Sequence, residues 1–270
     1  MSRSVANGNG NSNVGGRIQC RQAQKIFYDI SRHEEVVGLQ DMTLDINAGE
    51  FVAVIGPSGC GKTTFLNIVA GFEFQTAGEI TIDGKAITGP GPDRGVVFQE
   101  YALFPWLSVL HNVRYGLIER GISKKAADLT ATRWLKQVGL DEFSGKYPHE
   151  LSGGMRQRVA LIRVLANEPT ILLMDEPFAA LDALTRSVLQ KELLALWERS
   201  HQTVVFVTHN VDEAIFLADR MVIMSHRPSV VKEIVRVDLE RPRDVTSDAF
   251  NAYRRHATKS LEAEVSPTIN

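Results

Sequence analysis

The fold is decided by one stretch, Gly56-Pro57-Ser58-Gly59-Cys60-Gly61-Lys62-Thr63, which directly follows the apolar run Phe51–Ile55. It fits the pattern G-x-x-x-x-G-K-[ST]. The glycines let the backbone turn tightly, so that its N–H groups can point at phosphate oxygens. A helix that begins near Thr63 adds the positive end of its dipole at the same place. The stretch, together with Thr64, therefore predicts a loop that binds the phosphates of ATP or another nucleoside triphosphate.

Three side chains of this loop need separate interpretations. Lys62 is a mobile cation that can reach the β- and γ-phosphates, and the Thr63 hydroxyl can ligate a magnesium ion. Cys60 lies inside the loop with its N–H in use, so we interpret it as a filler and not as a catalytic thiol. ATP and Mg²⁺ are thus the predicted cofactors.

A pair of carboxylates follows a second apolar run, Ile171–Met174. At the end of a parallel strand, Asp175 can face the magnesium ion beside Thr63, and Glu176 can polarise the attacking water as a general base. Strand ends often carry acidic residues only for solubility, but the phosphate loop upstream favours the catalytic interpretation. His209, which also follows an apolar run, can supply a donor near the γ-phosphate.

Apolar runs that alternate with helical patterns predict an α/β fold with a mostly parallel sheet. The expected strands are Asp41–Ile46, Phe51–Ile55, Glu79–Ile82, Gly95–Phe98, Ile171–Met174, Val204–Val207 and Met221–Met224. The expected helices are Thr63–Ala70, Lys124–Val138 after a Ser123 cap, Gly153–Ala166 after a Ser152 cap, Leu181–Arg199 and Val211–Ala218. The stretch between Ser108 and Ala166 is mainly helical, which suggests a smaller inserted subdomain.

The composition is that of an ordinary globular protein. The 270 residues carry 30 basic and 32 acidic side chains, whereas a nucleic-acid binder would usually show a basic excess. We therefore expect no nucleic-acid partner.

Cys20 and Cys60 are far apart in sequence, which favours a reducing compartment over a disulfide scaffold. No apolar run approaches the roughly 20 residues needed to cross a bilayer, so a partner must supply any membrane-spanning part.

A third motif, Leu151-Ser152-Gly153-Gly154-Met155-Arg156-Gln157, identifies a family. With the phosphate loop, Asp175-Glu176, Asp182 and His209, the chain resembles the ATPase subunit of an ATP-binding cassette (ABC) transporter over about residues 20–240. The resemblance implies a P-loop NTPase core with a mostly parallel sheet, an antiparallel β subdomain and an inserted α-helical subdomain. The expected divisions are a disordered tail (1–16), the core (17–98 and 167–240), the helical signature subdomain (99–166) and a short C-terminal extension (241–270).

The Ser-Gly-Gly motif makes a second anion site, because it opens a helix with free N–H groups. In the family, two subunits pack head to tail, and this motif of one subunit closes over the nucleotide held by the other. The resemblance therefore implies that Ser152, Gly153 and Gly154 act in trans on a second ATPase subunit. Asp182 would lie near the dimer interface and communicate between the two nucleotide sites.

Two more site residues come from the resemblance. Gln99 matches the glutamine that senses the magnesium ion and the attacking water, and it joins the core to the helical subdomain. Phe27 matches the aromatic residue that stacks on adenine, although its neighbour Tyr28 is a second candidate and Phe27 can also be a core residue.

The segments Gly89–Gln99, Leu103–Trp106 and Arg241–Asp244 resemble importers for nitrate, sulfonates and taurine. This resemblance implies two transmembrane permease subunits and an extracytoplasmic solute-binding protein as partners. It also implies a peripheral location at the cytoplasmic face of the plasma membrane. The apolar segment Glu100–Leu107 would contact the coupling helix of the permease, or fill the helical subdomain. A soluble ABC ATPase without a transport role is the alternative function.

Overall fold

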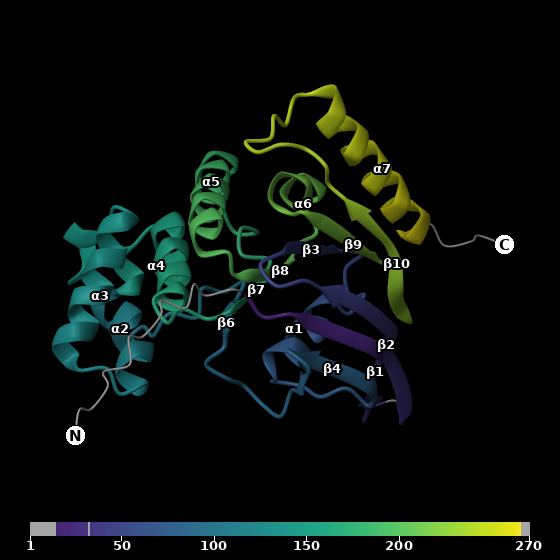
Figure 1. The fold of residues 1–270 in the computed structure, drawn as a ribbon, viewed down its shortest axis with the longest axis horizontal. Coiled ribbons are helices and arrows are strands. Elements are labelled where there is room, and N and C mark those ends of the chain that lie inside the picture. Colours follow the sequence, from purple (N-terminus) through teal and green to yellow (C-terminus); the bar gives the residue numbers. More distant parts are fainter. Residues whose placement is uncertain (1–14, 32, 266–270) are drawn as a thin grey trace, which may run out of the picture.

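The computed structural model describes residues 15–31 and 33–265 of the chain (Figure 1). Most of the expected disordered tail, residues 1–14, lies outside the described residues. Gly15 and Gly16 are buried, and the carbonyl of Gly16 accepts a hydrogen bond from the hydroxyl of Thr203 over 2.7 Å. These two glycines therefore belong to the packed part of the chain.

The parallel half of the sheet forms the centre of the molecule. In spatial order it consists of β6 (Arg94–Val97), β7 (Ile171–Asp175), β8 (Thr203–Val207), β3 (Phe51–Ile55) and β9 (Arg220–Met224). Every neighbouring pair in this half is parallel. The strands β3 and β8 are buried along their whole length, as expected of strands covered on both faces. The apolar runs therefore correctly predicted a mostly parallel sheet.

The other half of the sheet is mainly antiparallel. It comprises β1 (Ile18–Asp29), β2 (Glu34–Ile46), β4 (Ala77–Ile82), β5 (Lys85–Ala86) and β10 (Ser229–Arg236). The sequence pattern predicted only the second half of β2 and missed β1. Register shifts interrupt the β1–β2 pairing between Cys20 and Ile26, and such bulges break the regular alternation of apolar and polar residues. The strand β10 then joins the two halves, because it pairs parallel with β2 and antiparallel with β9.

Helices cover both faces of the parallel strands. Phe51, Ala53 and Ile55 of β3 pack into one core with α5 (Ala183–Ser200) and α6 (Val211–Leu217). Val52 and Val54 point to the opposite face and pack with α1 (Lys62–Ala70). Successive side chains of a strand face opposite sides of the sheet, so one short strand contributes to both cores and holds the loop that follows it.

Three helices form a separate layer beside β6 and β7 (Figure 1). They are α2 (Val109–Glu119), α3 (Lys124–Gln137) and α4 (Gly153–Leu165), and two short 3₁₀ turns, Asp141–Phe143 and Pro148–Glu150, connect α3 to α4. The predicted caps are confirmed, since Ser123 accepts a hydrogen bond from the N–H of Ala126 and Ser152 from that of Met155. A core of their own, which includes Val113 and Leu135, holds the three helices together.

The chain ends in α7 (Asp248–Val265), which lies along the outside of α6 and β9 (Figure 1). Ion pairs and backbone contacts attach this extension to α6. Arg254 of α7 binds Asp212 in the first turn of α6, and the buried Arg243 donates to the carbonyls of Ile215 and Ala218 at its other end. Within the described residues, no helix is both long and apolar enough to cross a membrane.

Candidate functional site

The carboxyl ends of the parallel strands meet at one edge of the sheet. The register pairs Val97 with Met174, Asp175 with Val207, and Val54 with Val207. Segments that directly follow these strands must therefore be neighbours, and open α/β sheets bind ligands outside this edge. The predicted site residues brought to this edge are the Gly56–Thr63 loop, Gln99, Asp175, Glu176 and His209.

The loop from Gly56 to Thr63 turns through a left-handed residue into α1. Gly61 has a φ of 104° and is the N-cap of the helix. A Cβ atom on Gly61 would lie 2.9 Å from Cδ2 of Leu39 and 3.1 Å from the carbonyl oxygen of Gly38. Only glycine fits both this conformation and this space, so Gly61 lets the loop lie tightly on β2.

Lys62 is the buried cation of the loop. Its side chain is 6% exposed, and Nζ donates hydrogen bonds of 2.9 Å to the carbonyls of both Gly56 and Pro57. Cys60 is also buried, with its Sγ 3.9 Å from Nζ. Burial raises the pKa of the Cys60 thiol despite the nearby lysine charge, which favours the interpretation of Cys60 as a filler and not as a nucleophile.

The Thr63 hydroxyl and the Asp175 carboxylate form a pair of oxygen ligands. The hydroxyl donates to Oδ1 of Asp175 over 3.3 Å, which joins the first turn of α1 to the end of β7. Burial raises the pKa of Asp175, and the hydrogen bond from Thr63 opposes that shift. Hard oxygen donors of this kind suit Mg²⁺, which usually takes one or two protein ligands besides substrate phosphates and water. The two residues therefore fit the predicted metal.

Glu176 and His209 are in direct contact at the same edge. Nδ1 of His209 lies 2.9 Å from Oε2 of Glu176. Glu176 has a φ of 44°, and its N–H donates to the carbonyl of Val207 in β8. An ionised carboxylate only accepts hydrogen bonds, so in this pairing Nδ1 carries a proton. The contact orients the carboxylate and leaves Nε2 of the ring for another partner.

The two other predicted site residues, Gln99 and Phe27, come from different parts of the chain. Gln99 is exposed two residues beyond the end of β6. Phe27 of β1 is half-buried, and a Cβ on Gly38 would lie 2.8 Å from its ring. Since the carbonyl of Gly38 also lies against Gly61, the ring is two contacts away from the N-cap of α1. The position suits a base that stacks beside the phosphate loop.

The Ser-Gly-Gly segment lies in the helical layer, apart from the phosphate loop. Figure 1 shows α4 separated from α1, with β6 and β7 between them in the view. The segment instead contacts the loop after Gln99 and the start of α5, since added Cβ atoms on Gly153 and Gly154 would lie 3.3 Å from the Tyr101 hydroxyl and 2.6 Å from Thr185 Cγ2. The structure therefore does not bring Ser152, Gly153 and Gly154 to the loop of the same chain.

Asp182 begins α5 next to that segment. Its carboxylate accepts a hydrogen bond from the N–H of Thr185 over 3.0 Å, and this bond lowers the pKa of the exposed side chain. Asp182 is thus the N-cap of α5. Its side chain is exposed.

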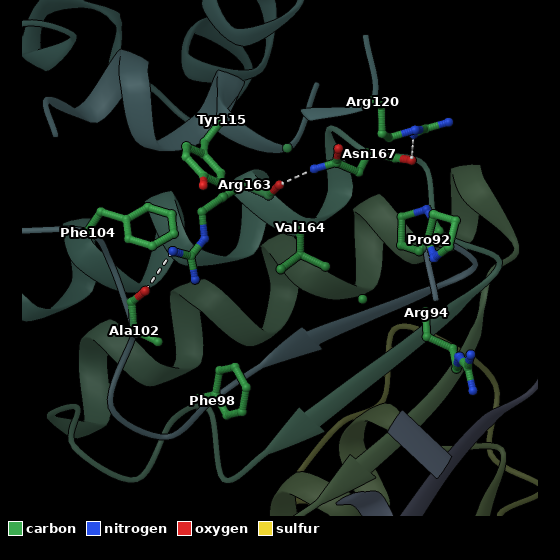
Figure 2. Close-up of a pocket in the computed structure, with 13 residues that line it drawn as sticks. Pro92, Arg94, Phe98, Ala102, Phe104, Tyr115, Arg120, Arg163, Val164 and Asn167 are labelled. Carbon is green, nitrogen blue, oxygen red and sulfur yellow. Dashed lines mark hydrogen bonds between the residues drawn. The ribbon is translucent and has the colours of Figure 1, made fainter. Parts of the chain in front are cut away.

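An apolar groove of about 510 Å³ lies between β6 and the helical layer (Figure 2). Phe98, Phe104 and Tyr115 form much of its surface, and Arg163 crosses it to donate to the carbonyl of Ala102 over 2.6 Å. Trp106, which packs on Phe104, is 70% exposed beside the groove. Part of the segment Glu100–Leu107 therefore fills the helical layer and part stays exposed. This agrees with either expected role of the segment, filling the helical subdomain or contacting a permease.

Sequence reasoning missed one buried ionic group beside the site. Glu213 of α6 is 4% exposed and accepts a hydrogen bond of 2.7 Å from the hydroxyl of Thr208. Arg186 of α5 lies 3.7 Å from the other carboxylate oxygen. The sequence places Glu213 in the first turn of a helix, where acidic residues are common. Its burial was therefore not expected from the sequence.

Known proteins resemble this chain over most of its length. A family model described as "ABC transporter" matches residues 39–179. An uncharacterised ABC transporter ATP-binding protein of Methanocaldococcus jannaschii is 54% identical over 85% of this chain and 86% of its own length. The taurine import ATP-binding protein of Roseobacter denitrificans is 49% identical, covering 78% of each chain. The aliphatic sulfonates import ATP-binding protein of Bacillus anthracis is 46% identical over 91% of this chain and 96% of its own.

The fold also matches solved structures. A dimeric ATP-binding cassette in a post-hydrolysis state, bound to ADP and Pi, superimposes with a TM-score of 0.73 at 33% identity. The match covers 83% of this chain and 100% of the other.

Proposed function

This chain belongs to the ABC transporter family, and we propose that it is the ATP-hydrolysing subunit of an importer for small sulfonates such as taurine, or for nitrate. The observation that carries this proposal is the single sheet edge that unites the phosphate loop, Asp175, Glu176 and His209. The relatives named for taurine and sulfonate import support the solute class.

The phosphate loop and Phe27 would bind the nucleotide. Free N–H groups of the loop and of the first turn of α1 would surround the phosphates, and Lys62 would move from its carbonyl partners to the β- and γ-phosphates. Phe27 stacks on adenine. Thr63 and Asp175, with Gln99 nearby, would hold Mg²⁺, which neutralises charge on the phosphate oxygens.

Glu176 is the general base of the proposed reaction. It accepts a proton from water while the water oxygen bonds to the γ-phosphorus, and the bond from that phosphorus to the bridging oxygen breaks to leave ADP and phosphate. His209 orients Glu176 through the 2.9 Å contact at Nδ1. Its Nε2 can donate to the γ-phosphate when both ring nitrogens are protonated.

The site is half of a shared one. The exposed Ser152 and the small residues Gly153 and Gly154 open α4 away from the phosphate loop of their own chain. In a head-to-tail dimer they would contribute N–H groups to the γ-phosphate bound by the second subunit, and Asp182 would lie between the two sites. The dimeric cassette of similar fold supports this assembly.

The apolar groove would receive a helix of a permease subunit. Its lining includes Phe98 and Ala102, on either side of Gln99 in the chain, so a helix bound there would move with the residue proposed to contact the nucleotide site. Two permease subunits and an extracytoplasmic solute-binding protein complete the proposed importer, with this chain peripheral at the cytoplasmic face of the membrane. The alternative, a soluble ABC ATPase, would leave the groove without a membrane partner.

Reconstitution tests the proposal. The chain, the permease and the binding protein encoded beside it would be placed in lipid vesicles, and ATP hydrolysis would be measured with taurine, an alkanesulfonate or nitrate. We expect the transported solute to stimulate hydrolysis. Tyr115→Arg, which puts a charge into the groove, should abolish stimulation, whereas Leu129→Arg, at an exposed position of α3 outside the groove lining, should not. Equal rates with every solute would contradict the importer assignment.

A further inference from the structure

Glu213 is a buried carboxylate that the proposed reaction does not use. It lies in the first turn of α6, two residues after the helix begins at Val211, and its side chain is 4% exposed. A buried carboxylate is costly unless charges or hydrogen bonds compensate it. Its partners therefore show what the residue holds in place.

The first partner is the loop that carries His209. The hydroxyl of Thr208 donates to Oε2 of Glu213 over 2.7 Å, and the same hydroxyl accepts a hydrogen bond of 3.0 Å from the N–H of Asn210. The N–H of Thr208 also donates to the carbonyl of Val54 in β3. The residues on both sides of His209 are thus held by one hydroxyl, whose direction the Glu213 carboxylate sets.

The second partner is the turn that carries Asp182. Nε of Arg186 lies 3.7 Å from Oε1 of Glu213. Nη2 of the same guanidinium donates to the carbonyl of Leu181 over 2.9 Å. Leu181 directly precedes Asp182, so one carboxylate is linked both to the His209 loop and to this turn.

We propose that Glu213 is a positioning residue, which fixes His209 against Glu176 and links this pair, through Arg186, to the Asp182 turn at the subunit interface. The inference rests on the proposed function for the roles of His209 and Asp182. Loss of the carboxylate frees the Thr208 hydroxyl to rotate, and a small displacement of His209 from Glu176 then slows the reaction. Nucleotide binding by the phosphate loop is not affected.

Three variants test this role. Glu213→Ala removes both links, Thr208→Val removes only the hydroxyl, and Glu213→Gln keeps an acceptor for Thr208 but loses the charge that faces Arg186. The control is Glu50→Gln, because Glu50 is a largely covered carboxylate that also pairs with an arginine, Arg220, at the opposite end of β3. All variants are compared as the complete importer and as the isolated chain.

We expect Glu213→Ala and Thr208→Val to lower kcat by about 10- to 100-fold, the range for small misplacements of catalytic groups, with ATP affinity unchanged. The double variant should be no slower than Glu213→Ala alone, since Glu213→Ala already removes the hydrogen bond that Thr208→Val breaks. Glu213→Gln should recover much of the rate. Glu50→Gln should lower only the thermal stability.

A second measurement does not depend on turnover. In protein labelled with ¹³C-histidine, the ring signals of His209, assigned through His209→Gln, should shift in Glu213→Ala and Thr208→Val but not in Glu50→Gln. Folded variants with unchanged His209 signals and unchanged kcat would overturn the positioning role. A wild-type chain that binds ATP without hydrolysing it in any complex would refute the proposed function, and the histidine signals would still decide the role of Glu213.

Discussion

The hydroxyl of Thr63, in the first turn of α1, donates a hydrogen bond to Oδ1 of Asp175 at the end of β7. The two residues are 112 positions apart in the sequence. Their contact places the phosphate loop and the acidic pair at one point, where two oxygen atoms can share a metal ion.

Thr63→Ala should weaken the binding of ATP in the presence of Mg²⁺ by about tenfold, which corresponds to about 1.4 kcal/mol. The reason is the loss of one of the proposed protein ligands of the metal ion. Thr63→Ser keeps the hydroxyl and should bind almost normally. Titration of a fluorescent ATP analogue with and without Mg²⁺ measures the effect, and an equal loss under both conditions would contradict the metal assignment.

Glu176→Gln should bind ATP but hydrolyse it at least about 100-fold more slowly, since an amide is no general base. The unhydrolysed nucleotide should hold two chains together. Size-exclusion chromatography with ATP would then show a dimer that the wild type forms only transiently. Normal hydrolysis by this variant would assign the base elsewhere.

Phe27→Ala should raise the dissociation constant for ATP by about tenfold, because stacking of a base on an aromatic ring contributes about 1–3 kcal/mol. Tyr28→Ala is the control, since Tyr28 is the neighbouring aromatic residue and is 59% exposed. Isothermal titration of both variants compares them. If Tyr28→Ala has the larger effect, the adenine partner is Tyr28.

The stability of the wild type relative to Glu213→Gln should depend on pH. Burial raises the pKa of Glu213 above its ordinary value of 4.5. Between these two pKa values, the folded chain keeps the carboxyl proton that the unfolded chain has lost. The carboxyl group therefore makes its full contribution to stability below about pH 4.5, and this contribution declines as the pH rises through the raised pKa. Urea unfolding of both proteins across this window measures the difference. A difference that grows in favour of the wild type with rising pH would contradict the direction of the shift.

Much of the site was predictable because its residues follow apolar runs directly. A short buried strand in a parallel sheet has a recognisable pattern, and its carboxyl end lies at the ligand edge. This rule locates the Gly56 loop, Asp175 and His209 without any knowledge of strand order. The helix caps Ser123 and Ser152 were predictable for a similar reason, since a cap bonds to a residue three positions away.

The antiparallel half of the sheet was less predictable. The strand β1 is shifted in register against β2 at several points, so its apolar residues do not alternate in a simple way. The contact of α7 with α6 was also missed, because Arg254 and Asp212 are 42 positions apart and each is an ordinary surface residue in sequence.

The sequence by itself determined the phosphate loop, the acidic pair, the Ser-Gly-Gly segment and the α/β fold, because each depends on residues that are close together in the chain. Only the tertiary structure decided that Thr63 touches Asp175, that His209 touches Glu176, and that α4 lies apart from α1. It also showed that Glu213 is buried between Thr208 and Arg186. Such contacts depend on how distant segments pack, and a local pattern of residues does not specify that packing.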